Sequence, residues 1–123
     1  EAMQAARIAA ADGGLSVRVL NMHTIKPIDK EAVLSAISDT RRIITVEDHE
    51  VMGGLGSAVA EVVASSGKAC AFKMLGHQDA FSTIGLQEDL LAMAKIDANG
   101  IAETIQEMMH ADFEADDAWD DEF

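Results

Sequence analysis

The densest group of side chains that could do chemistry is the run Glu47-Asp48-His49-Glu50. It follows the β-branched run 43–46, and in open α/β sheets ligands bind beside the carboxyl ends of the strands. A metal site would combine His49 with two carboxylates, but consecutive side chains seldom converge on one ion without ligands from elsewhere. General-base chemistry at His49 or Glu47 lacks a recognisable nucleophile or second acid. We therefore expect no catalytic or metal-binding residue here, and predict a solvated or subunit-facing loop.

A glycine-rich segment, Gly53-Gly54-Leu55-Gly56-Ser57, comes next and leads into an apolar stretch that is typical of a helix. Backbone N–H groups at a helix start can bind a phosphate. The segment is incomplete as a dinucleotide fingerprint, because Val59 stands where the third glycine belongs, and it lacks the Lys of a P-loop. Glycines that allow a tight turn and a close approach to neighbours or to a partner subunit are the better explanation. We predict no cofactor-binding residue in it. The candidate interface or loop contacts are Glu47, His49, Gly53, Gly54, Gly56 and Ser57.

Two further polar groups follow expected strands. His23, Thr24 and Lys26 precede Pro27, where a turn held by hydrogen bonds is a better explanation than a phosphate site. His77 and Asp79 begin the loop 76–85, which is longer than most connections and is therefore a candidate contact surface.

The elements that must position these groups follow from hydrophobic periodicity and from turn residues. Asp29 and Asp97 are placed to cap helices, and Gly13-Gly14 to end one. Strands that alternate with helices predict an α/β fold, a three-layer α/β/α arrangement around a small, mostly parallel sheet with right-handed crossovers. No strand precedes the first helix, so the sheet is expected to lack its first strand. We expect helices at 1–12, 30–38, 57–64, 86–94 and 98–109, and strands at 15–20, 43–46 and 69–75.

Composition limits the partners. The 123 residues suffice for one domain, and the net charge of −13 argues against nucleic acid, which requires clustered Lys and Arg. No stretch has the apolar length of a membrane span, so we expect no membrane association. A single cysteine, Cys70, cannot form an internal disulfide and lies in an apolar run. It favours a buried thiol in the cytoplasm.

The acidic charge is uneven. Seven acids follow His110 with no base among them, and the aromatic residues of this tail lack periodic spacing. We expect residues 1–110 to form the domain and residues 111–123 to be a disordered acidic tail, or one that docks by its aromatic residues.

Three strings in register resemble the C-terminal domain of transketolases, particularly those split into two polypeptides. The first runs from Val17 to Asp29, including His-Thr-Ile-Lys-Pro. The second joins Thr45-Val46-Glu47-Asp48-His49 to the glycine segment 53–61, and the third spans Gly76 to Gly85. Order and spacing agree from about residue 1 to residue 109. The glycine block is shared with deoxyxylulose-phosphate synthases and with the β subunits of 2-oxo-acid dehydrogenases, which stay open as alternatives, as does a free-standing phosphate- or nucleotide-binding module.

The resemblance implies a parent enzyme of the pentose phosphate pathway. It would transfer a two-carbon ketol unit between sugar phosphates with thiamine diphosphate and a divalent metal, Mg²⁺ or Ca²⁺. In such enzymes the cofactor lies between two preceding domains at the interface of a homodimer. No catalytic, cofactor or metal residue is therefore carried over to this chain, which is expected to be inactive alone and to serve assembly, with regulation as a second role. Two features depart from the family: the strand ahead of the first helix is absent, and the acidic tail is added.

Overall fold

The computed structural model describes residues 1–110 as helices around a small parallel sheet. The predicted disordered tail, 111–123, lies outside the described residues. The elements in chain order are α1 (Ala2–Gly13), α2 (Lys30–Thr40), β1 (Arg42–Glu50), α3 (Leu55–Ser65), β2 (Ala71–His77), α4 (Gln87–Met93) and α5 (Ala98–Met108).

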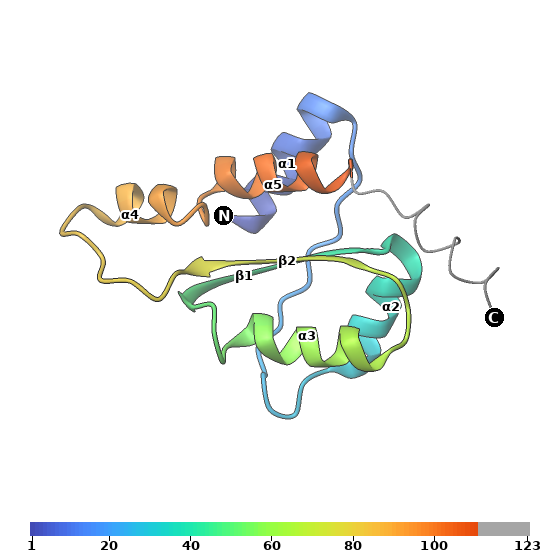
Figure 1. Ribbon diagram of the computed structural model, residues 1–123. Coiled ribbons are helices and arrows are strands. Elements are labelled where there is room, and N and C mark those ends of the chain that lie inside the picture. Colours follow the sequence, from blue (N-terminus) through green and yellow to red (C-terminus); the bar gives the residue numbers. More distant parts are fainter. Residues whose placement is uncertain (111–123) are drawn as a thin grey trace, which may run out of the picture.

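The predicted three-layer α/β/α arrangement is confirmed (Figure 1). Helices α1 and α5 cover one face of the sheet, and α2 and α3 cover the other. Strands β1 and β2 are parallel, with Arg42 opposite Ala71 and Val46 opposite Leu75. Helix α4 lies beside the α1/α5 layer, after the loop that leaves β2.

One predicted strand does not form. Residues 15–20 are extended, and their exposure alternates as expected, with Leu15, Val17 and Val19 half-buried between exposed neighbours. The segment nevertheless pairs with no strand among residues 1–110, so the sheet has two strands rather than three in this part of the chain. A β-strand requires hydrogen bonds to a neighbouring strand as well as alternating side chains. The alternation of residues 15–20 was predicted correctly, but the pairing was not.

The other expected elements are present with shifted ends. The largest change is in β1, which continues to Glu50 instead of ending at Val46. The polar run 47–50 therefore belongs to the strand, and its predicted loop conformation is wrong. Polar side chains suggested a loop, but a strand can carry them wherever its end reaches the edge of the covering helices.

The capping residues that the sequence predicts are found at the helix ends. The Oδ1 atom of Asp29 accepts a hydrogen bond from the N–H of Ala32 at 3.0 Å, and Oδ1 of Asp97 accepts one from Gly100 at 3.1 Å. Gly14 ends α1 in the left-handed region, at φ 63°. The two aspartates satisfy N–H groups that a helix N-terminus leaves without a partner, and the N–H of Gly14 donates to carbonyl oxygens at the end of α1. Together they fix where α2 and α5 begin and where α1 ends.

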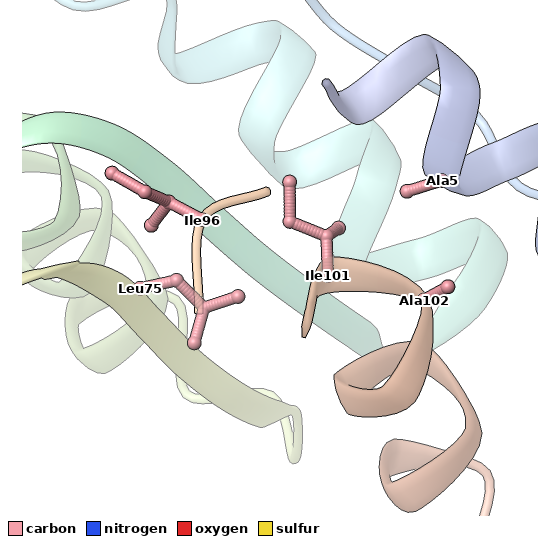
Figure 2. Packing of buried hydrophobic residues seen from close by; sticks show 5 residues of the cluster. All are labelled: Ala5, Leu75, Ile96, Ile101 and Ala102. Carbon is pink, nitrogen blue, oxygen red and sulfur yellow. The ribbon is translucent and has the colours of Figure 1, made fainter. Parts of the chain in front are cut away.

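Each face of the sheet has its own apolar cluster. On the α1/α5 side, small and branched side chains from both helices meet β2 and the turn before α5 (Figure 2). These side chains belong to Ala5, Leu75, Ile96, Ile101 and Ala102. On the opposite side, α2 and α3 bury Val33, Ile37, Val59 and Val62. Ala5 and Ala9 of α1 are completely buried.

Helix α3 also sits very close to the sheet, and Gly56 makes this possible. A Cβ at this position would lie 2.8 Å from Sδ of Met74 and 2.9 Å from Oγ1 of Thr45. Real Cβ atoms do not approach heavy atoms this closely, so a larger residue must displace the helix or both side chains.

We predict that Gly56→Ala lowers the free energy of unfolding by about 1–2 kcal/mol. Overpacking costs roughly 1–3 kcal/mol, and the better helix propensity of alanine offsets at most about 1 kcal/mol. Thermal and urea denaturation measure the change. Gly85→Ala is the matched control, because its Cβ would meet only ordinary contacts with Leu90, at 3.5 Å and beyond. Equal stability of the two variants would contradict the prediction.

Candidate functional site

The carboxyl ends of β1 and β2 carry most of the candidate residues, and Glu47 organises this edge. Its side chain is 8% exposed. Oε2 accepts a hydrogen bond from the N–H of Leu55 at 2.8 Å, and Oε1 accepts one from Gly56 at 2.9 Å. A carboxylate of the chain itself therefore occupies the N-terminus of α3, where the helix dipole favours an anion.

Glycines allow side chains and backbone to approach closely at this edge of the sheet. A Cβ on Gly54 would collide with Oε2 of Glu47, and a Cβ on Gly76 would lie 2.8 Å from the carbonyl oxygen of His49. Gly53 makes the turn with a φ of 80°, and its N–H donates to Oγ of Ser57 at 2.8 Å. The glycine segment thus serves a tight turn and a close approach, as we expected of it. The N–H groups of Leu55 and Gly56 that a phosphate would need are already bonded to Glu47.

The other polar residues of the edge are exposed. Nε2 of His77 lies 2.7 Å from Oδ1 of Asp48, which joins the ends of the two strands. His49 is 64% exposed, with Nδ1 at 2.8 Å from the carbonyl oxygen of Glu50 and 3.9 Å from Oε2 of Glu47. Polar contacts between partly exposed side chains, such as that of His77 with Asp48, contribute little to stability.

The Glu47 carboxylate bonds the start of α3. Among residues 1–110, no group of three or more His, Cys, Asp or Glu side chains is arranged to hold a metal ion. Two imidazoles and an exposed acid are present, but no nucleophile is bonded to either histidine.

The sequence candidates separate into two groups. Glu47, Gly54 and Gly56 contact one another inside the chain, whereas His49 and Gly53 are exposed. Ser57 is half-buried beside them. Interface contact stays a prediction, and it now applies best to His49 and Gly53.

Away from this edge, the remaining candidates have local roles. Nδ1 of His23 lies 2.6 Å from Oγ1 of Thr24 in the exposed segment before Pro27, consistent with a hydrogen-bonded turn. Cys70 is half-buried, and burial raises the pKa of its thiol above the usual value, more than the nearby Arg41 charge and a backbone hydrogen bond from Ile43 lower it. A raised pKa disfavours the thiolate, so this cysteine is a weak nucleophile.

The sequence predicts the loop 76–85, which includes Phe81, as a contact surface, but it did not identify the other exposed apolar side chains near it. Phe81 and Ile84 are fully exposed and Leu86 is largely exposed, as is Met93 at the end of α4. The length of loop 76–85 gave the only signal, since isolated apolar residues in a loop form no periodic pattern. Nor did the sequence identify the bonds of Glu47 to α3, although an acid shortly before a glycine turn and a helix could have suggested them.

Known proteins of similar sequence and fold identify the family of this domain. The family described as "Transketolase, C-terminal domain" matches residues 1–101. A protein named as a transketolase C-terminal section in Methanocaldococcus jannaschii is 40% identical over 109 residues, which are 89% of this chain and 33% of that protein. The 1-deoxy-D-xylulose-5-phosphate synthase of Syntrophotalea carbinolica is 38% identical over 91% of this chain and 18% of its own length.

A solved structure agrees with these relatives. A split-gene transketolase, described as an inactive β4 tetramer, matches with a TM-score of 0.76 and 33% identity over 87% of this chain and 33% of its own. The chain spans about a third or less of the length of these proteins. It belongs to the transketolase C-terminal domain family, and the resemblance inferred from the three sequence strings is confirmed. Within residues 1–110, no helix has the length and apolar character needed to cross a membrane.

We predict that Glu47→Ala lowers the free energy of unfolding by about 2 kcal/mol, because two helix N–H groups lose a buried acceptor. Hydrogen exchange should accelerate at the amides of Leu55 and Gly56. Asp48→Ala, which removes the exposed neighbouring acid, should change stability by less than about 0.5 kcal/mol and leave those two amides protected. Similar losses in both variants would show that Glu47 has no special role.

Proposed function

We propose that this chain is the C-terminal assembly domain of a transketolase, whose parent enzyme transfers a two-carbon ketol unit between sugar phosphates. The observation that carries the assembly role is the loop 76–85, in which Phe81 and Ile84 are fully exposed. The Glu47 carboxylate, in contrast, is already bonded to the start of α3. Large apolar side chains exposed together mark interaction surfaces. The split-gene relative, described as a tetramer of one subunit type, supports association through a domain of this kind.

In this proposal thiamine diphosphate and its divalent metal, Mg²⁺ or Ca²⁺, are bound by the preceding domains of a dimeric parent enzyme. This chain contributes contacts through the loop and through the exposed edge at His49 and Gly53. A cytoplasmic location and a regulatory contribution from the same surface are part of the proposal. The cofactor would carry the difficult step, as an electron sink for the breaking carbon–carbon bond.

A calorimetric titration tests the division of roles. Thiamine diphosphate with Mg²⁺ should give no saturable heat with the 123-residue chain, and saturable binding with the parent enzyme that contains the preceding domains. Micromolar binding to the chain alone would overturn the absence of a cofactor site. The deoxyxylulose-phosphate synthase alternative predicts the same result, so the parent enzyme must also be assayed for ketol transfer between sugar phosphates.

The contact surface has its own test in the parent enzyme. Phe81→Ser with Ile84→Ser should weaken association of its domains or subunits by about 30-fold, the effect of losing about 2 kcal/mol at an interface centre. Thermal stability of the 123-residue chain should be unaffected, because both side chains are fully exposed in it. Met3→Ser, at a 59% exposed position of α1, is the matched control. Unchanged association of the double variant would remove the loop from the interface.

A further inference from the structure

Four basic residues gather at the end of the sheet where both strands begin, and we refer to them as the basic end. They are Arg41, Arg42, Lys68 and Lys73. Lys73 lies opposite Ile44, two residues along from Arg42, the first residue of β1. Neighbouring strands are about 4.8 Å apart and rise about 3.3 Å per residue, so the backbones of Arg42 and Lys73 lie within about 8 Å. Arg41 and Lys68 come just ahead of the two strands.

The basic end lies beside the last turn of α5. Nε of Arg42 donates to the carbonyl oxygen of Met108 at 2.9 Å. Lys73 is exposed and points to the same face of the sheet, because it is in register with Ile44, which packs against the α1/α5 cluster. In Figure 1, α5 ends on the side of the molecule where β1 and β2 begin. The chain after α5 therefore starts next to the basic end.

The two lysines of the basic end have no carboxylate partner in the described part of the chain. Among residues 1–110, no acid lies within ion-pair distance of the Lys68 or Lys73 ammonium. Nζ of Lys68 donates instead to Oγ of Ser38, at 2.8 Å. The acid nearest in sequence to the basic end, Asp39, is bonded to Arg18, with 3.0 Å between Oδ2 and Nη1. Positive charge at this surface is thus available to an acidic segment.

The most acidic segment of the chain follows directly. Residues 111–123 contain seven acids, no base and three aromatic residues. The carbonyl end of a helix disfavours nearby negative charge, so acids that follow α5 are stabilised by cations beside it. Asp112 comes four residues after Met108, a reach of up to about 13 Å, which covers the basic end. Trp119 stands between Asp117 and Asp120, so its ring can lie over a cation that these acids attract.

The charge of the rest of the chain does not prevent this contact. Residues 1–110 are acidic overall and repel the acidic segment at long range. Charges farther apart than about 8 Å are largely screened at 0.15 M salt, however, so the nearest groups decide where the segment lies. The nearest groups are those of the basic end.

We propose that residues 111–123 turn back after α5 and dock on the basic end of the same chain. Their acids pair with Arg41, Lys68 and Lys73, and the ring of Trp119 covers one of these cations. Several exposed ion pairs act together here, and each alone contributes little. The docked segment neutralises the basic end and covers it against other acidic partners, and high salt releases it. The docking does not depend on the function of the parent enzyme.

Trp119 reports the docking directly, since it is the only tryptophan of the 123 residues and no tyrosine is present. Its fluorescence in the 123-residue chain is compared with that of a free peptide of residues 111–123, with acrylamide as a neutral quencher. At low salt, where the ion pairs are least screened, quenching in the chain should be at least about threefold weaker than in the peptide. At 1 M salt, where the Debye length falls to about 3 Å, quenching should approach that of the peptide.

A double variant identifies the surface. Arg41→Gln with Lys68→Gln should remove most of the shielding of Trp119, because two exposed cations leave the basic end. Lys26→Gln with Lys30→Gln is the matched control, since it removes the same charge from exposed positions near the start of α2. An 11-residue helix is about 16 Å long, so Lys30 lies about two Debye lengths from Arg41 at 0.15 M salt. The control should keep the shielding of the unmodified chain.

Three results would overturn the proposal. Quenching in the unmodified chain that equals that of the peptide at low salt would exclude docking. Equal effects of the two double variants, or shielding that persists at 1 M salt, would exclude the basic end as the surface. Shielding that rises with protein concentration would assign the segment to a second copy. The salt titration of the unmodified chain decides independently if a variant fails to fold.

Discussion

The bond between the Glu47 carboxylate and the first N–H groups of α3 is the constraint on which this edge of the domain depends. It ties the end of β1 to the start of the helix that follows, and Gly54 leaves room for the carboxylate, since a Cβ there would collide with it. The Glu47 carboxylate can be buried, at 8% exposure, because both of its oxygens accept hydrogen bonds and the helix dipole stabilises its charge. The same contact occupies the position at which many α/β domains bind a phosphate. In this chain the N–H groups of Leu55 and Gly56 at that position are bonded to Glu47.

Much of the fold follows from local patterns. Caps at Asp29 and Asp97 and the glycine turn after α1 are short-range chemistry, and the sequence predicts them correctly. The β-branched run in β1 marks a strand covered on both faces for the same reason. Residues 15–20 show the limit of such inference. Their alternation correctly predicts an extended, alternately buried segment, but hydrogen-bonded pairing depends on another part of the chain and leaves no local trace.

The candidate site was harder to predict than the fold. Glu47 was identified as a contact residue, but its partners, Leu55 and Gly56, are eight and nine positions away and depend on where the helix begins. The pairing of Asp48 with His77 joins neighbouring strands and is invisible to any short-range pattern. The expectation that this chain carries no reacting centre stays a prediction, argued from candidates that the sequence offers without a partner.

Among residues 1–110, β1 pairs on one side only, with β2, and this open edge has a consequence for the solution behaviour of the chain. Apolar strand edges promote aggregation, whereas a net charge of −13 makes the copies repel one another. That repulsion acts over a Debye length of about 10 Å at 0.1 M salt and shrinks to about 3 Å at 1 M. Low ionic strength therefore keeps the chain dispersed, and high salt leaves the edge unprotected. The solubility of this domain thus depends on the ionic strength of its buffer as well as on its fold.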